Sequence, residues 1–152
     1  MIAGTGSGCG KTTVTLAVLR AMQRRKIPLA AFKCGPDYID PMFHKAVLGI
    51  PSRNLDLFFI SEREVRGQIV RSIPQNGLGV IEGVMGFYDG VSGTTDTASA
   101  AHLARETGTP AILVVRPKGQ SLSLAAMLSG FRNFTENTLC GVVLNGISDT
   151  MY

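Results

Sequence analysis

Short apolar runs alternate along the chain with longer segments in which apolar residues recur at helical spacing. The runs predict five strands, and the longer segments predict the helices between them. The expected strands cover residues 1–4, 29–34, 78–81, 111–115 and 139–144. The expected helices cover residues 11–26, 41–48, 97–107 and 121–134, and a further one follows Ser61, which forms a capping box with Glu64.

Strands that are apolar on both faces and alternate with helices are typical of a parallel sheet that helices cover on both sides. We therefore expect an α/β fold with a doubly wound, mostly parallel sheet. In such sheets ligands bind beyond the carboxyl ends of the strands, so the loops that follow the strands are examined first. These loops hold the glycine-rich and polar stretches GTGSGCGKTT, KCGPDYIDP, EGVMGFYDG, RPKGQS and NGISD.

The stretch GTGSGCGKTT, residues 4–13, has the chemistry of a phosphate-binding loop. Its end fits the pattern G-x-x-x-x-G-K-[ST], although Gly4 lies one residue further back than the pattern requires. The glycines let backbone N–H groups turn toward an anion, Lys11 reaches the β- and γ-phosphates, and Thr12 offers its hydroxyl to Mg²⁺ at the start of a helix. We expect a P-loop nucleotide site, with contacts from Gly6, Gly8, Gly10, Lys11, Thr12 and Thr13.

Cys9 lies within this loop, and two interpretations are open. A cysteine between glycines where a strand passes into a helix resembles a nucleophile elbow. That interpretation leaves Lys11 and Thr12 without a role, and neither His44 nor His102 is an evident base for the thiol. We therefore interpret Cys9 as a residue that fills the loop.

The other two cysteines, Cys34 and Cys140, lie in apolar runs, where cysteine usually acts as a small buried hydrophobe. Three cysteines without a C-x-x-C pair argue against both a disulfide framework and a structural zinc site.

Acidic residues follow two of the expected strands. Glu82 ends the third strand, at the position where a Walker B carboxylate holds Mg²⁺, and an ordinary strand-end glutamate is the alternative. Lys33, Asp37 and Asp40 gather just beyond the second strand. The lysine could balance charge on a transferred phosphoryl group, and a carboxylate could join the Mg²⁺ shell or position a substrate. The alternative is a proline-rich turn with solvated acids.

Composition narrows the function classes. The chain has 152 residues, of which 45% are apolar and 17% charged, which is ordinary for one globular domain. The longest apolar run, residues 111–115, is far too short to span a membrane, so a cytoplasmic protein is expected. The net charge of +4 suits an acidic ligand, but no recurring aromatic and basic pattern indicates nucleic-acid binding.

Further motifs carry a family resemblance. FKCGPDYIDPMFH, RNLD, EGVMGFYDG, TASAAHLA and GVVLNGI follow GTGSGCGKTT in that order. In this combination the chain resembles the cobyrinate a,c-diamide synthases over essentially its whole length. Their wider relatives, dethiobiotin synthetase and cobyric acid synthase, share the phosphate loop that is one residue longer. The resemblance implies a P-loop amidoligase that uses ATP and Mg²⁺ to activate two acetate groups of a corrinoid as acyl phosphates, which ammonia then attacks.

The resemblance also implies roles for individual residues. Lys11 and Lys33 would neutralise phosphates, and Thr12, Asp37 and Glu82 would hold Mg²⁺. Asn145 would read the adenine base. The residues implied to face the corrinoid carboxylates are Tyr38, Asp40, Gly86, Tyr88 and Ser99. Two departures qualify this set, because Ala100 stands where the family more often has threonine, and Arg116 stands where an acid is common.

In this family a glutaminase domain with its own cysteine nucleophile supplies the ammonia. We expect residues 1–152 to form the synthetase domain of a longer protein, with the glutaminase part outside them, and a homodimer is left open. Two other functions remain possible. One is amidation of another tetrapyrrole, such as nickel-sirohydrochlorin, and the other is a non-catalytic nucleotide switch, against which the two acids of GPDYIDP argue.

Overall fold

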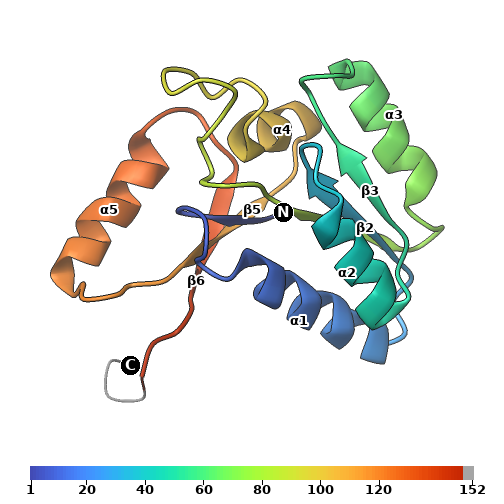
Figure 1. The fold of residues 1–152 in the computed structure, drawn as a ribbon, viewed down its shortest axis with the longest axis horizontal. Helices are drawn as coiled ribbons and strands as arrows, with labels where there is room; N and C mark the ends of the chain where they lie inside the picture. Colours follow the sequence, from blue (N-terminus) through green and yellow to red (C-terminus); the bar gives the residue numbers. More distant parts are fainter. Residues whose placement is uncertain (149–152) are drawn as a thin grey trace.

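The computed structural model describes residues 1–148, which form a parallel sheet of six strands in the order β3-β2-β4-β1-β5-β6 (Figure 1). The strands are β1 (Ile2–Gly4), β2 (Leu29–Cys34), β3 (Ser52–Leu55), β4 (Leu78–Glu82), β5 (Ala111–Val115) and β6 (Leu139–Leu144). The helices are α1 (Lys11–Arg24), α2 (Ile39–Leu48), α3 (Glu62–Ser72), α4 (Ala100–Thr107) and α5 (Leu122–Asn133). The predicted α/β fold with a parallel sheet is confirmed.

Two hydrophobic clusters lie on the two faces of the sheet. In one, Leu19 of α1 and Leu48 of α2 are buried in the same cluster as Val114 of β5. In the other, residues of α3 and α4 such as Val65 and Leu103 are buried with strand residues, and α5 packs against this cluster from the β6 end (Figure 1). Helices therefore cover both faces, and the carboxyl ends of the strands are left for binding.

The register of the parallel strands brings the loops after β1, β2 and β4 close together. Lys33 of β2 lies opposite Glu82 of β4, and Ile2 of β1 lies opposite Glu82 on its other side. The phosphate loop follows β1, which lies between β4 and β5. The loops after β1, β2 and β4 therefore all begin at the carboxyl ends of neighbouring strands, on the same side of the sheet.

One strand was not predicted from the sequence. β3 is largely polar, with Ser52, Arg53 and Asn54, and it pairs with β2 alone at the edge of the sheet. An edge strand does not need apolar side chains on both faces, so the search for apolar runs passed over it.

Three helix boundaries differ from the predicted ones by two residues or more, and α5 is one residue shorter than predicted at each end. α2 begins at residue 39 rather than 41, because Pro41 is tolerated in a first turn, where its missing N–H has no partner. α4 begins at residue 100 rather than 97, because Ser99 caps it by accepting a hydrogen bond from the N–H of His102. α1 ends at Arg24, two residues early. The capping box of Ser61 and Glu64 at the start of α3 is confirmed.

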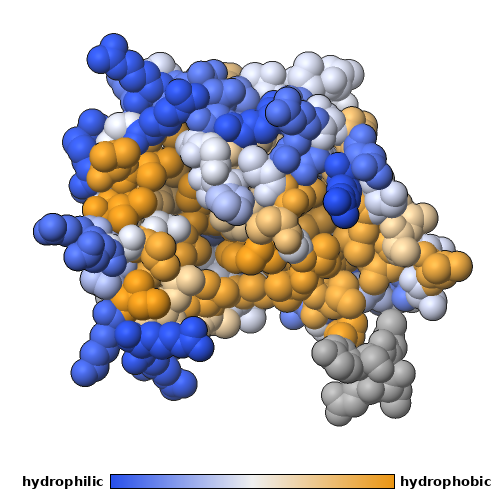
Figure 2. Space-filling view, turned by 180° about the vertical axis from the view of Figure 1, so that it is seen from behind, coloured by the Kyte–Doolittle hydropathy of each residue, from blue (hydrophilic) through white to orange (hydrophobic). Residues whose placement is uncertain are grey.

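β6 departs from the expectation that every strand is covered on both faces. Val142 and Leu144 are 47% and 42% exposed, and Cys140 is exposed rather than buried. Apolar residues gather across the face that lies behind in Figure 1 (Figure 2). Among residues 1–148 no helix is long and apolar enough to cross a membrane.

Candidate active site

The phosphate loop is shaped by glycines in conformations that other residues rarely adopt. Gly8 and Gly10 have φ values of 74° and 100°, and Gly10 is the N-cap of α1. A side chain at Gly10 would also collide with the amide of Asn145, which donates a hydrogen bond to the carbonyl of Cys9 at 2.9 Å. The loop therefore presents the start of a 14-residue helix, which favours an anion.

Lys11 joins this loop to the segment that follows β4. Its side chain is 8% exposed, and its ammonium donates to the carbonyls of Gly6 at 2.9 Å and Met85 at 2.7 Å. Burial, which disfavours the charged form, lowers the pKa of Lys11, and the positive charge of the nearby Lys33 lowers it further. Met85 has a φ of 44°, a strained value for a residue with a side chain, and such strain is concentrated at functional sites.

Four side chains from four different segments meet beside Lys11. The hydroxyl of Thr12 donates to Glu82 at 2.5 Å and lies 3.4 Å from a carboxylate oxygen of Asp40. The ammonium of Lys33 lies 2.5 Å from Asp40 and 3.3 Å from Glu82, and it donates to the carbonyl of Gly83 at 2.9 Å. We call these four residues the charge network; its one cation, Lys33, pairs with both carboxylates, so each of these charges has a partner.

The charge network favours the charged forms of Glu82 and Lys33. Burial alone would raise the pKa of Glu82, but hydrogen bonds from His44 and Thr12 and the charge of Lys33 outweigh it and lower that pKa. Burial likewise opposes the charged form of Lys33, yet the hydrogen bond and charge of Asp40, with the charge of Glu82, raise its pKa. The site therefore combines fixed positive and negative charge in a buried position.

His44 is the residue that the sequence interpretation missed. It is fully buried, and its Nε2 lies 3.0 Å from the second carboxylate oxygen of Glu82, while its Nδ1 lies 2.9 Å from the hydroxyl of Ser52. The signal was present in the sequence, because Asp40, His44 and Leu48 recur every four residues and share one face of α2. That face of α2 packs on the sheet, so His44 contacts the carboxylate oxygen of Glu82 that Thr12 and Lys33 do not contact.

A cleft of about 410 Å³ opens over this network. We call it the phosphate cleft. It brings together most of the residues predicted for catalysis, nucleotide and metal, namely Gly8, Gly10, Lys11, Thr12, Thr13, Lys33, Asp37, Asp40 and Glu82.

The oxygen atoms in the phosphate cleft suit Mg²⁺. Thr12, Asp40 and Glu82 bring a hydroxyl and two carboxylates within hydrogen-bonding range of one another, and Mg²⁺ prefers oxygen ligands. Asp37 lies further out, since one of its carboxylate oxygens accepts the N–H of Ile39 at 2.8 Å and the other is 3.9 Å from Lys33.

The residues expected to face substrate are not all in the phosphate cleft. Tyr38 is 81% exposed at the start of α2, and the N–H of Gly86 donates to Asp89 at 2.7 Å. Ser99 is fully buried as the cap of α4, so its hydroxyl is already used within the fold. The hydroxyl of Tyr88 donates to the carbonyl of Phe131 at 2.6 Å.

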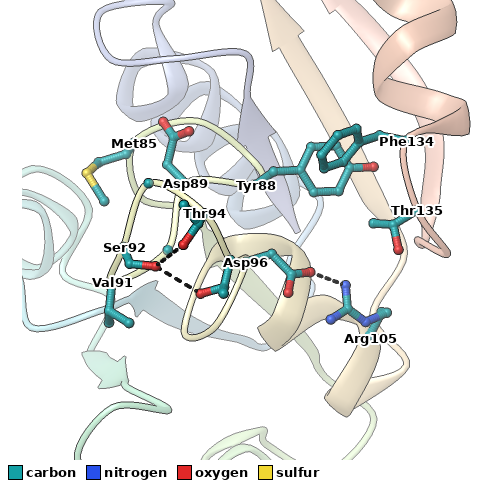
Figure 3. Close-up of a pocket in the computed structure, with 13 residues that line it drawn as sticks. Met85, Tyr88, Asp89, Val91, Ser92, Thr94, Asp96, Arg105, Phe134 and Thr135 are labelled. Carbon is teal, nitrogen blue, oxygen red and sulfur yellow. Dashed lines mark hydrogen bonds and ion pairs between the residues drawn. The ribbon is translucent and has the colours of Figure 1, made fainter.

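Tyr88 lines a larger cleft of about 740 Å³ (Figure 3). In this cleft Tyr88 and Phe134 lie together on one side, Met85 and Val91 lie on the other, and Asp96 is paired with Arg105 at 2.6 Å (Figure 3). Met85 lines this cleft and the phosphate cleft. Of the five residues expected to face substrate, Asp40 lines the phosphate cleft and Tyr88 lines this larger cleft, whereas Tyr38, Gly86 and Ser99 line neither.

Two of the three cysteines, Cys9 and Cys34, are buried, which does not suit a nucleophile. Cys9 is 5% exposed and packs against Gly4, where any side chain would collide with its sulfur. This position supports the interpretation of Cys9 as loop filler. Burial raises the pKa of Cys34 to about 12, as expected for an inert thiol.

A second cluster, formed by Glu62, His102 and Glu106, has the spacing of a metal site but not the chemistry. The Nδ1 of His102 accepts the N–H of Ala98 at 3.0 Å, so the neutral ring carries its proton on Nε2 and offers no free lone pair. Glu106 is already paired with Arg66 at 2.8 Å.

Comparison with known proteins identifies the family. Residues 1–151 match the family described as "CobQ/CobB/MinD/ParA nucleotide binding domain". The chain belongs to this family. The predicted P-loop fold and nucleotide-binding character of the chain are thereby confirmed.

Among curated relatives, the cobyrinate a,c-diamide synthases of Clostridium tetani and Salmonella typhimurium are 41% and 45% identical over 100% of this chain. The enzyme of the same name from Clostridium acetobutylicum is 47% identical over the same share. In each case the match covers 34% of the relative, so the chain spans about a third of the length of these proteins.

Proposed function

We propose that this chain is the ATP-binding synthetase part of an enzyme that amidates carboxylates of a corrinoid, in the manner that its relatives' name describes. The expected substrate is cobyrinate or hydrogenobyrinate, and the expected positions are its a and c acetates. The charge network of Thr12, Lys33, Asp40 and Glu82 at the end of the phosphate loop carries the proposal, because it provides what carboxylate activation needs.

A carboxylate is a poor electrophile because its leaving group would be oxide. In the proposed reaction a carboxylate oxygen attacks the γ-phosphorus of ATP, the bond to ADP breaks, and an acyl phosphate forms. Ammonia then attacks the acyl carbon, phosphate leaves and a proton is lost. Such a transfer depends on positioning and on cations that balance the developing charge more than on covalent catalysis by the protein.

The residues of the phosphate cleft fit these needs. In this proposal Lys11 would neutralise the β- and γ-phosphates, and Lys33 would balance the charge that develops as the carboxylate attacks the γ-phosphate. Thr12, Glu82 and Asp40 would hold Mg²⁺, which supplies electrostatic stabilisation of the phosphates when bound. We assign Asp40 rather than Asp37 to this shell because Asp40 lies beside Thr12. His44 acts as a positioning residue for Glu82.

Other assignments remain part of this proposal. Asp37 and Tyr38, at the open mouth of the site, are candidates for the substrate carboxylate. Asn145 packs on the phosphate loop, where its amide donates to the carbonyl of Cys9, and its proposed role is contact with the adenine base. The ammonia would come from a glutaminase part beyond these 152 residues.

The test is an assay with ATP, MgCl₂, cobyrinate and ammonium chloride, which supplies ammonia without a glutaminase. Mass spectrometry should detect singly and doubly amidated products that require ATP. Replacing cobyrinate by nickel-sirohydrochlorin separates the two tetrapyrrole substrates. A protein that binds ATP and forms no amide from either compound would rule out the proposal and favour a nucleotide switch.

A further inference from the structure

A hollow of about 250 Å³ lies beside the phosphate loop, on the side of β5. We call it the Arg116 hollow, and the residues that line it are Thr5, Gly6, Ser7, Gly8, Cys9 and Arg116. Arg116 directly follows β5, and it is the only charged residue among the described residues that line the hollow. Ser7 and Gly8 also line the phosphate cleft, so the two hollows meet along the same part of the loop.

The side chain of Arg116 is exposed, and the fold does not use its charge. Within the described residues 1–148, no carboxylate pairs with its guanidinium and no carbonyl accepts a hydrogen bond from it. Arg66 and Arg105, in contrast, are paired with carboxylates at 2.8 and 2.6 Å. A guanidinium presents its N–H groups in a planar fork that matches the oxygens of a phosphate. Arg116 therefore keeps its donors available for an anionic ligand.

The backbone after β6 fixes the path of this side chain. Gly146 has a φ of 71°, and a Cβ at this position would lie 3.2 Å from Nε and 3.6 Å from Cγ of Arg116. The N–H of Asn145 donates to the carbonyl of Val115 at 2.7 Å, which holds the ends of β5 and β6 together. The stem of Arg116 therefore runs close to Gly146, and its guanidinium lies between Asn145 and the phosphate loop.

The order of the strands indicates which part of a nucleotide Arg116 would meet. β4, β1, β5 and β6 are neighbours in this order, and their carboxyl ends lead into Glu82, the phosphate loop, Arg116 and Asn145. In the proposed function the γ-phosphate is placed at the Glu82 end of this row, and the adenine base is placed at Asn145. A nucleotide that joins the two ends passes the end of β5 with the phosphate that is nearest to its base.

We propose that Arg116 binds the α-phosphate of the nucleotide, by donating N–H groups to its oxygens from the side of the loop opposite to Lys33. This inference rests on the nucleotide-binding part of the proposed function. Hydrogen bonds between a guanidinium and a phosphate are stronger than bonds between neutral groups, since both partners are charged. ATP and ADP share the α-phosphate, so Arg116 contributes equally to the affinity for both and takes no part in the transfer of the γ-phosphate.

The test measures binding without turnover, by equilibrium dialysis of the protein against radiolabelled ATP or ADP with MgCl₂ and without a tetrapyrrole. Arg116→Gln removes the charge and should weaken ATP and ADP equally, by about 10-fold. Arg116→Lys should recover part of this loss, and Arg116→Asp should weaken both nucleotides about 100-fold, because it repels the phosphate. Added KCl should shrink these differences, since salt screens an exposed charge pair. The control Arg132→Gln, which removes an exposed arginine in the last turn of α5, should change neither affinity.

Wild-type affinity for both nucleotides in Arg116→Gln would overturn the inference. A loss confined to ATP would also overturn it, because it would move the contact to the γ-phosphate. Equal losses in the three Arg116 variants at every KCl concentration would show that charge is not the cause, with the same consequence. Urea denaturation checks that the variants fold, as expected for changes at an exposed position.

The proposed function is tested separately, by the appearance of an amide with ammonium chloride. A wild type that binds ATP and ADP, loses affinity for both in Arg116→Gln and forms no amide would contradict the proposed function and keep the role of Arg116. A wild type that forms the amide and shows no effect of Arg116→Gln on nucleotide affinity would do the reverse.

Discussion

The two neighbouring clefts have similar volumes and opposite electrostatic organisation. In the phosphate cleft the ions pair with one another, as Lys33 does with Asp40 and Glu82. The second cleft, of about 410 Å³, lies between the loops after β3 and β4 and is lined by Phe58, Phe59 and Val84; we call it the aromatic cleft, and its surface is largely carbon. The first arrangement suits charge that develops during a reaction, and the second suits recognition of a ligand already formed. The comparison therefore predicts that substitutions in the phosphate cleft lower kcat, whereas substitutions in the aromatic cleft change the affinity for a ligand.

The largest effect is expected for Lys11→Ala, which removes the cation proposed to neutralise the β- and γ-phosphates. We expect amide formation to fall about 1,000-fold or more, because charge neutralisation is the main contribution of the protein to phosphoryl transfer. Initial rates with ammonium chloride measure it. Lys45→Ala, which removes an exposed lysine on α2, is the matched control. Near-normal turnover in Lys11→Ala would remove the loop from the mechanism.

Asp40→Asn is expected to lower kcat about 100-fold and to raise the Mg²⁺ concentration needed for half-maximal rate, since it removes one charged oxygen beside Thr12. Rates measured against MgCl₂ at saturating ATP and cobyrinate test this effect. Asp37→Asn provides the comparison. A stronger dependence on Mg²⁺ in Asp37→Asn than in Asp40→Asn would return the metal to Asp37.

His44→Ala should affect stability and activity together. It deletes a fully buried side chain and removes the contacts of His44 to Oε2 of Glu82 and to the hydroxyl of Ser52, which should lower the free energy of unfolding by about 2–4 kcal/mol. Urea denaturation measures that loss. His44→Gln keeps hydrogen-bonding capacity and should recover part of the activity. If both variants had wild-type kcat, His44 would have no role in positioning Glu82.

The smallest effect is expected for Cys9→Ala. The thiol is buried against Gly4, so its removal should cost about 1 kcal/mol of stability and change kcat by less than about threefold. Thermal unfolding and the amidation assay test the two parts. Loss of activity in a folded Cys9→Ala protein would revive the nucleophile interpretation and place covalent chemistry within the phosphate cleft.

The parts predicted well from the sequence are local in the chain. The loop from Gly4 to Thr13 is contiguous, and its glycines, lysine and hydroxyls have a fixed order that needs no distant contact to be recognised. The helices and the five apolar strands follow from periodicity over a few residues. β3 was not predicted because it is an edge strand whose four residues are largely polar and show no apolar run.

The features that the sequence did not predict are contacts between segments that are distant in the chain. His44 and Glu82 are separated by 38 residues, and nothing in either segment alone connects them. The same holds for Lys11 and the carbonyl of Met85, which are 74 residues apart. The order of Asp37 and Asp40 around Thr12 also depended on where α2 begins, two residues before the predicted start.

The sequence by itself determined the α/β fold, the phosphate loop and the set of acids and lysines that follow the strands. It did so because hydrophobic periodicity and loop chemistry are properties of neighbouring residues. Only the tertiary structure decided which of those charges neutralise one another and that one oxygen of Asp56 has no hydrogen-bond partner among residues 1–148. Charge pairing and burial depend on how strands that are far apart in the chain align in the sheet. Local sequence patterns do not specify that alignment.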